Sequence, residues 1–189
     1  MRVSGGSARG KRLTAKGSPH IRPTSARVAD ALFNSLGPRI QGARVLDLFA
    51  GSGRLGIEAL SRGAEHAVFV ERDARHAGVI RANLAAAGLA DRGAVRRGDA
   101  LAALPTLAAE GRRYDLIVID PPYGRDLQRE ALRRVAATDL LAPGGLAVAE
   151  GHWRDDPGDV DGLMRVRSSR YGETALWIYT RDAKEEDDV

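Results

Sequence analysis

The stretch ARVLDLFAGSGRLG, residues 43–56, decides the fold. Its apolar first half, residues 43–49, predicts a buried β-strand, and a glycine-rich turn follows directly. This turn has the spacing G-x-G-x-x-G from Gly51 to Gly56, and it opens a helical pattern that ends at Gly63. A strand, a glycine loop and a helix in this order are typical of a βαβ unit in a parallel sheet.

Strands and helices alternate along the rest of the chain. Further strands are predicted at residues 66–71, 93–99, 114–120 and 143–150, and helices at residues 22–37, 73–88 and 125–139. Residues 100–111 are predicted to be helical only in part, because Pro105 interrupts the pattern. Residues 163–181 alternate like a hairpin and would add an antiparallel edge. The expected fold class is α/β, with a mostly parallel sheet, helices on both faces and an antiparallel final strand.

Composition excludes several kinds of chemistry. The chain has no cysteine, so disulfides, thiolate metal sites and cysteine nucleophiles are ruled out. Its histidines (His20, His66, His76 and His152) show no ligand spacing, so no metal is expected. No apolar run approaches the ~20 residues of a membrane span. Because the polar N-terminus lacks the apolar core of a signal peptide, we expect a cytoplasmic protein that does not bind a membrane.

Positive charge is concentrated at the start of the chain. Residues 1–29 hold seven Lys or Arg residues and no acid, although the net charge of the whole chain is only +4. We therefore expect a basic arm at residues 1–23, a folded domain at residues 24–181 and an acidic, disordered tail at residues 182–189, with both ends loosely attached. Such an arm suits contacts to nucleic-acid phosphates. A solvated arm without a partner is the alternative that charge alone leaves open.

Four successive predicted strands end in an acid, namely Asp47, Glu71, Asp99 and Asp120. Ligands bind outside the carboxyl ends of parallel strands, so these carboxylates are expected to share one crevice. Helix capping accounts for only one or two of them. Glu71 follows Gly51 by twenty residues, which is the distance at which an acid holds a ribose hydroxyl.

The glycine loop taken alone suggests a nicotinamide dinucleotide. Asp47 argues against that cofactor, because its charge would face the pyrophosphate at short range. The sulfonium and ammonium groups of S-adenosylmethionine would instead be attracted there, and Asp99 is placed to accept a hydrogen bond from the adenine amine. The expected cofactor is therefore S-adenosylmethionine.

The strand at residues 114–120 runs into the motif DPPY, Asp120 to Tyr123, whose prolines end the ladder in a stiff turn. The exocyclic amine of a base is a poor nucleophile, because its lone pair is delocalised into the ring. Asp120 and the carbonyl group of Pro121 can accept both N–H bonds of the amine, and the ring of Tyr123 can stack on the base. The motif predicts methylation of an amino group on a planar substrate; a turn that merely ends a strand is the plain alternative.

These motifs resemble those of the bacterial 16S rRNA guanine-N2 methyltransferases of the RsmD type, over nearly the whole chain. The resemblance rests on GGSARGKRL (5–13), RPTSARVADALFN (22–34), DLFAGSGRLGIEALSRGA (47–64), VERD (70–73), DPPY (120–123) and YGETAL (171–176). The segment at residues 22–34 is the most specific of these. The resemblance implies a Rossmann-like, S-adenosylmethionine-dependent methyltransferase fold with a reversed final strand, and it identifies residues 24–181 as the methyltransferase domain.

The resemblance also implies the site residues. The cofactor would be bound by Asp47, Phe49, Ala50, Gly51, Ser52, Gly53, Glu71, Arg72, Asp99, Ala100 and Asp120. The catalytic corner would be Asp120, Pro121, Pro122 and Tyr123, and the RNA would be bound by Arg9, Lys11, Arg12, Arg22, Thr24, Arg27 and Tyr171. For Tyr171, packing on an edge strand is an equal alternative. The implied substrate is the N2 of one guanine in 16S rRNA or in a small-subunit ribosomal or pre-ribosomal particle.

Four positions depart from the family pattern, and two of these, Ser4 and Ser7, lie in an arm that is usually bulkier and more hydrophobic. Ala26 stands where an acid is usual, and Ala29 stands where an arginine is frequent, which bears on RNA docking but leaves the cofactor site intact. Other functions stay open at this stage: an amino-group methyltransferase acting on DNA adenine-N6 or protein glutamine-N5, an NAD-dependent oxidoreductase, or a non-catalytic RNA-binding factor. The first of these more often has Asn in place of Asp120.

Overall fold

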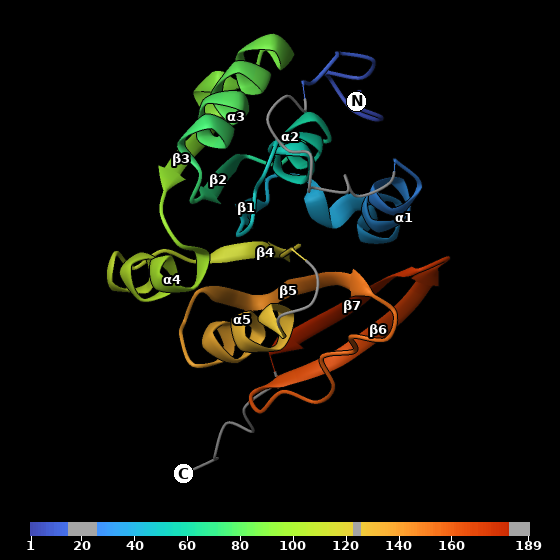
Figure 1. Cartoon of the computed structure of the whole chain (residues 1–189), viewed down its shortest axis with the longest axis vertical. Helices are drawn as coiled ribbons and strands as arrows, with labels where there is room; N and C mark the ends of the chain where they lie inside the picture. Colours follow the sequence, from blue (N-terminus) through green and yellow to red (C-terminus); the bar gives the residue numbers. More distant parts are fainter. Residues whose placement is uncertain (15–25, 123–125, 182–189) are drawn as a thin grey trace.

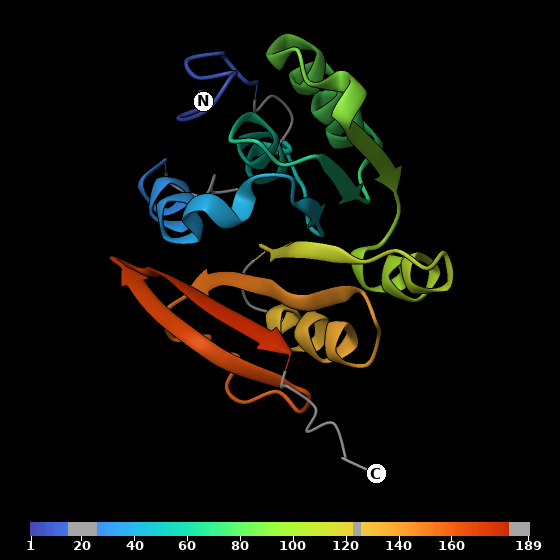
Figure 2. The ribbon, with the colours of Figure 1, turned by 180° about the vertical axis from the view of Figure 1, so that it is seen from behind.

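A seven-stranded sheet with helices on both faces makes up most of the molecule (Figures 1 and 2). The computed structural model describes residues 1–14, 26–122 and 126–181. The strands are β1 (Arg44–Asp47), β2 (His66–Glu71), β3 (Gly93–Arg97), β4 (Tyr114–Ile119), β5 (Leu141–His152), β6 (Leu163–Tyr171) and β7 (Thr174–Arg181). The helices are α1 (Ala26–Leu36), α2 (Arg54–Ser61), α3 (Ala74–Ala87), α4 (Ala100–Ala109) and α5 (Leu127–Ala136), with 3₁₀ turns η1 (Gly37–Ile40) and η2 (Ala90–Arg92).

The strand order is β3-β2-β1-β4-β5-β7-β6. The first five strands in the chain are parallel to one another, whereas β7 runs antiparallel between β5 and β6. The predicted α/β class, the mostly parallel sheet and the reversed final hairpin are therefore confirmed.

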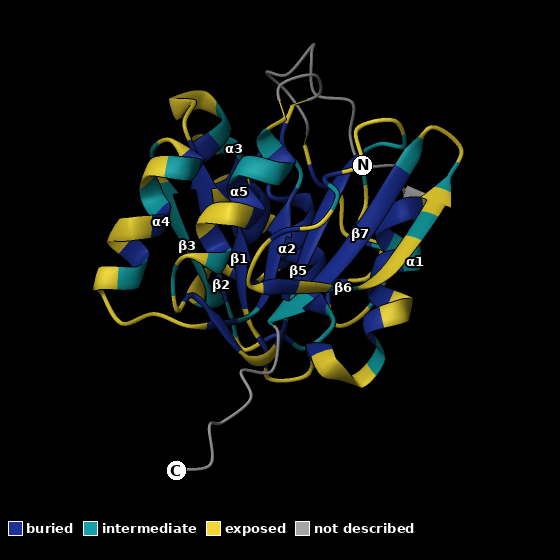
Figure 3. Ribbon diagram, turned by 90° about the horizontal axis from the view of Figure 1, so that it is seen from below, coloured by how far each residue is buried: buried dark blue, intermediate teal, exposed yellow. Residues whose placement is uncertain are grey.

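Side chains alternate between the two faces of the sheet and form two hydrophobic clusters. One cluster joins α1, α2 and α3 to one face and includes Val45, Phe69 and Val118. The other joins α4 and α5 to the opposite face and includes Leu46 and Ile117. Figure 3 shows the strands and the inward sides of the helices as buried, with the exposed residues on the outer sides of the helices and on β6. Both faces of the parallel strands are covered, which is why these strands read as continuous apolar runs.

The α4 helix is continuous, so the prediction that Pro105 confines the helix to part of this segment is wrong. A proline at this position removes the N–H group that would bond to the carbonyl oxygen of Leu101. The Arg134 guanidinium group on α5 donates to that oxygen instead, at 3.5 Å. A neighbouring helix thus supplies the missing donor, which the local sequence cannot reveal.

Residues 1–14 are packed against the domain, so the expectation of a loosely attached arm is wrong for this part of it. Val3, Ala8 and Leu13 are buried in the cluster that contains α1, α2 and α3. Every residue of α2 is buried as a result, because the arm covers the side of this helix that faces away from the sheet. Figure 1 shows the arm, marked N, beside α2.

Two polar side chains of α2 bind the backbone of the arm. The Glu58 carboxylate accepts hydrogen bonds from the N–H groups of Ser4 at 2.9 Å and Gly5 at 2.8 Å, and it also pairs with Arg62 at 2.7 Å. The Ser61 hydroxyl accepts a further bond from the arm at Ala8 N–H, 2.9 Å away. These bonds satisfy three backbone N–H groups of the arm and determine its course over α2.

Some sequence expectations fall on residues that the structure does not describe. The start of the helix predicted at residues 22–37 and the acidic tail at residues 182–189 both lie outside the described residues. Among the described residues, no helix is long and apolar enough to cross a membrane.

We predict that Glu58→Ala lowers the free energy of unfolding by about 2–4 kcal/mol, because three N–H donors lose a buried charged acceptor. The arm should also become cleavable by trypsin at Arg9, Lys11 or Arg12. Urea unfolding and limited proteolysis measure the two effects. The matched control is Glu130→Ala, which removes another i,i+4 Glu–Arg pair, at 2.7 Å, from an exposed surface and should change stability by less than about 1 kcal/mol. Equal behaviour of the two variants would contradict the prediction.

Candidate active site

The sheet register brings three of the predicted acids to one edge and one face. Asp47 is level with Phe69 on β2 and with Val118 on β4. Glu71 and Asp120 each lie two residues beyond those partners, so all three acids belong to the face covered by α1, α2 and α3. The carboxyl ends of β1, β2 and β4 therefore present a group of carboxylates, as the sequence predicts.

The glycine loop begins directly after β1 and needs glycine for two different reasons. Gly51 and Gly53 have φ angles of 54° and 78°, in the region that only glycine adopts at little cost. Gly53 N–H closes the turn by donating to Ala50 O at 2.6 Å. A side-chain carbon at Gly56 would overlap the Phe69 ring, so this glycine allows α2 to lie close against β2.

Glu71 holds the glycine loop from the side of β2. Its carboxylate accepts hydrogen bonds from Gly51 N–H and from Asp73 N–H, both at 2.8 Å. The side chain is almost fully buried. Each carboxylate oxygen can accept a second hydrogen bond, so this position can hold a ribose hydroxyl while it keeps the loop in place.

Asp47 is the most deeply buried of the three acids, at 2% exposure. Its carboxylate accepts one hydrogen bond, from Gly56 N–H at 3.0 Å. Burial, together with the nearby charges of Asp120 and Glu71, raises the pKa of Asp47 to about 7 against the lowering effect of that bond. Negative charge is thus concentrated at this edge of the sheet, and a cationic ligand would relieve the repulsion.

Other predicted cofactor residues border the same edge. Asp99 caps α4 by accepting from Ala102 N–H at 2.9 Å, and its neighbour Ala100 is buried. Asp99 follows β3, whose last residue is level with Glu71 on β2. Of the others, Phe49 and Ser52 are half-buried, Ala50 is buried and Arg72 is exposed.

The proposed acceptor corner follows β4. Asp120 is half-buried, Pro121 is buried and Pro122 is exposed to solvent. Tyr123 lies outside the described residues, so its predicted stacking role rests on the sequence alone.

Asn83 on α3 is a residue that the sequence analysis missed. Its side-chain amide donates to Ser52 O at 2.9 Å and to Thr14 O at 3.0 Å, while its carbonyl oxygen accepts from Thr14 N–H at 2.8 Å. It therefore joins the arm, at Thr14, to the glycine loop. A polar residue on the buried, otherwise apolar side of α3 was the available signal.

The structure separates the predicted RNA-binding residues into groups. Arg9, Lys11 and Arg12 are exposed on the arm, and Arg27 is exposed on α1. Arg22 and Thr24 lie outside the described residues. Tyr171 ends β6 and packs, half-buried, against the cluster that contains α1, α2 and α3.

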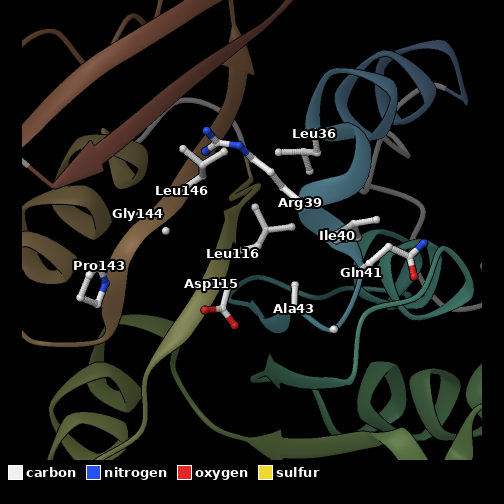
Figure 4. A pocket seen from close by; sticks show the side chains of 12 residues that line it. Leu36, Arg39, Ile40, Gln41, Ala43, Asp115, Leu116, Pro143, Gly144 and Leu146 are labelled. Atoms are coloured by element: carbon white, nitrogen blue, oxygen red, sulfur yellow. The ribbon is translucent and has the colours of Figure 1, made fainter.

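A cavity of about 420 Å³ lies at the opposite edge of the sheet (Figure 4). Its walls come from the end of α1, η1 and the starts of β4 and β5, and Asp115 points into it from β4. The glycine loop and the four acids lie at the other ends of the strands, so this cavity is not part of the candidate site. Among residues 1–14, 26–122 and 126–181, no His, Asp and Glu cluster could hold a metal ion.

Known proteins with similar sequences identify the family. The family model described as "Conserved hypothetical protein 95" matches residues 1–180. The Escherichia coli K12 protein "Ribosomal RNA small subunit methyltransferase D" is 34% identical over 190 residues, which cover 100% of this chain and 94% of that protein. The chain belongs to this family. The resemblance that the sequence motifs carry is thereby confirmed.

Two further relatives support the assignment. The Bacillus subtilis protein "Putative rRNA methyltransferase YlbH" is 40% identical over 183 residues, which are 96% of this chain and 99% of the relative. The solved structure described as "Putative methyltransferase yhhF from Escherichia coli" has a TM-score of 0.86 at 32% identity. The match covers 97% of this chain and 99% of the chain in that structure. The predicted methyltransferase fold is therefore confirmed over nearly the whole length.

We predict that Asp47→Asn makes the cofactor-free protein more stable at pH 8 than the wild type. Between the ordinary pKa of 3.8 and the folded-state pKa of about 7, the folded protein keeps a proton that the unfolded chain releases, so stability falls as the pH rises through this window. An asparagine does not titrate. The stability difference between variant and wild type should therefore grow by roughly 2–3 kcal/mol from pH 5 to pH 8 in urea unfolding.

Asp115→Asn is the control for this measurement. Arg44 lowers the pKa of Asp115, so that carboxylate stays ionised throughout the same pH range. Its stability difference from the wild type should be independent of pH between 5 and 8. A difference for Asp47→Asn that is equally flat would show that the Asp47 carboxylate is not perturbed.

Proposed function

We propose that this protein transfers a methyl group from S-adenosylmethionine to the exocyclic N2 of a guanine in 16S rRNA. The observation that carries the proposal is the convergence of Asp47, Glu71 and Asp120 at one edge of the sheet, beside a glycine loop and a diproline corner. Relatives named as small-subunit ribosomal RNA methyltransferases support the class of substrate. The protein is a member of a methyltransferase family, and S-adenosylmethionine is its cofactor.

The residues present fit this cofactor. Asp47 and Asp120 would face its ammonium and sulfonium groups, and the repulsion that raises the pKa of Asp47 would be relieved by them. Glu71 would hold the ribose hydroxyls, and Asp99 and Ala100 would bind the adenine. The same carboxylates would repel the pyrophosphate of a nicotinamide dinucleotide, which disfavours an oxidoreductase.

S-adenosylmethionine, when bound, supplies an activated methyl group to a nucleophile that lies in line with it. Asp120 would accept one N–H bond of the guanine amine, and the carbonyl oxygen of Pro121 would accept the other. The two acceptors would orient the nitrogen lone pair and favour a pyramidal nitrogen. Because Pro121 is buried in a stiff turn directly after β4, both acceptors stay in a defined position. Asp120 or water would take up the proton that the nitrogen releases.

A guanine inside a helix cannot reach this corner, so the target base would be unpaired or flipped out. The exposed arginines and lysine of the arm would hold phosphates around it, which positions the RNA without reading its sequence. We propose that the substrate is a small-subunit ribosomal or pre-ribosomal particle in the cytoplasm.

The test is methyl transfer to small-subunit particles isolated from a strain that lacks the protein. Mass mapping of the product should find one methyl group on the N2 of one guanine in 16S rRNA. Transfer to DNA or protein instead of rRNA, or tight NAD(H) binding without S-adenosylmethionine binding, would overturn the proposal.

We predict that Asp120→Ala lowers the rate of methyl transfer by about 100-fold or more, since the amine loses an orienting acceptor. In equilibrium binding, the affinity for S-adenosylmethionine should fall far less than the transfer rate, because Asp47 and Glu71 remain to hold the cofactor. Asp115→Ala is the matched control, because it removes a carboxylate from the opposite end of the same strand. The proposed role of Asp120 would be wrong if the two variants had the same transfer rate.

A further inference from the structure

A cluster of aromatic and basic side chains lies at the sheet edge that carries the acceptor corner, outside the residues discussed so far. Trp153 directly follows β5. The guanidinium carbon of Arg170 lies 4.0 Å from the centre of the Trp153 ring, and that of Arg154 lies 4.9 Å from it. The His152 ring is 5.8 Å away, tilted by 33°. Two positive charges are thus held against one indole ring, in the range of cation–π attraction.

Short backbone contacts determine where these side chains lie. Trp153 N–H donates to Glu173 O at 3.0 Å, in the turn between β6 and β7. The Arg170 Nε–H group donates to Gly172 O at 2.8 Å, in the same turn. Trp153 is half-buried against the cluster that contains α4 and α5, while Arg154 and Arg170 are exposed. The base of the cluster is therefore anchored, and its charged ends face solvent.

The charge of the two arginines is not neutralised within the described part of the chain. Neither Arg154 nor Arg170 takes part in an ion pair with the described residues. Arg165 on the same strand as Arg170 differs, since it pairs with Asp156 at 2.9 Å. Two exposed guanidinium groups without a counterion favour an anionic ligand, and guanidinium binds phosphate through paired N–H groups.

The cluster is close to the acceptor corner. On the adjacent strand, Ala149 is level with Ile119, which makes Glu150 the neighbour of Asp120. Trp153 lies three residues further along, roughly 10 Å at about 3.3 Å per residue. Its packing against the α4 and α5 side places it across the sheet from the arm, which packs on the α2 side. The acceptor corner therefore lies between the arm and this cluster.

We propose that Trp153, Arg154 and Arg170 form a second RNA-binding site, which holds backbone phosphates on the far side of the methylated guanine from the arm. Trp153 acts as a positioning residue that keeps both guanidinium groups directed at the RNA. The proposal rests on the proposed function, because it requires an RNA substrate at the carboxyl edge of the sheet. With contacts on both sides, the RNA strand would cross the edge at the acceptor corner.

The double variant Arg154→Ala/Arg170→Ala tests the site in the full-length protein, with small-subunit particles and with naked 16S rRNA. The KM for RNA should rise about 10-fold or more at physiological salt, with no change in affinity for S-adenosylmethionine. The slope of log binding constant against log salt concentration should fall in magnitude by about 1–2, since up to two phosphate contacts are lost. Arg154→Lys/Arg170→Lys keeps the charges and should restore most of the slope.

The matched control is Arg39→Ala/Arg113→Ala, which removes two exposed positive charges from the opposite edge of the sheet. It should leave the KM and the salt slope near the wild-type values. Equal effects in both double variants would show a general effect of positive charge and would overturn the proposed RNA-binding site. A loss of binding to particles but not to naked rRNA would assign the cluster to a protein partner and also overturn it. A wild-type protein that neither binds nor methylates RNA would instead overturn the proposed function.

Discussion

The burial of a carboxylate at the end of β1 is the constraint on which the rest of the site depends. Asp47 lies in the interior with one hydrogen bond, and Glu71 and Asp120 add negative charge to the same edge. In a cofactor-free fold this arrangement is unfavourable, because desolvation and like charges both oppose ionisation. It becomes favourable when a cationic ligand binds. The repulsion among the carboxylates of the cofactor-free protein therefore contributes to its affinity for such a ligand.

The glycine loop and the arm support the site that contains this buried carboxylate. Glu71 holds the loop from β2, and Asn83 holds it from α3 while binding the arm at Thr14. The arm is tied in turn to α2 through Glu58. Contacts between the arm and the domain therefore continue as far as the loop beside the cofactor site. Residues 1–14, which read as part of a flexible basic extension, belong to the site's supporting structure, and their exposed cations are carried on a docked backbone.

The two sides of the sheet contribute different chemistry to one edge. The side of α1, α2 and α3 carries the buried carboxylates and the basic arm, and the side of α4 and α5 carries the cluster around Trp153. The acceptor corner after β4 lies between them, at the centre of the sheet order. A corner in this position can be reached by an RNA segment whose flanking phosphates are held on both sides.

By itself, the sequence determined the order of strands and helices, the glycine loop and the acids at strand ends. Those features follow from local periodicity and from residue types with strong backbone preferences, so they can be read without knowing any long-range contact.

The continuity of α4 through Pro105 could not be read in this way, because the compensating donor is Arg134 on another helix. The docking of residues 1–14 onto α2 was equally hidden. Glu58 and Ser61 look like ordinary solvent-facing residues of a helix, and only the fold brings the arm's N–H groups to them. The same holds for Trp153, Arg154 and Arg170, since strand pairing alone brings the ends of β5 and β6 to the two sides of the start of β7. Contacts between distant parts of the chain are set by packing, and packing has no local sequence signature.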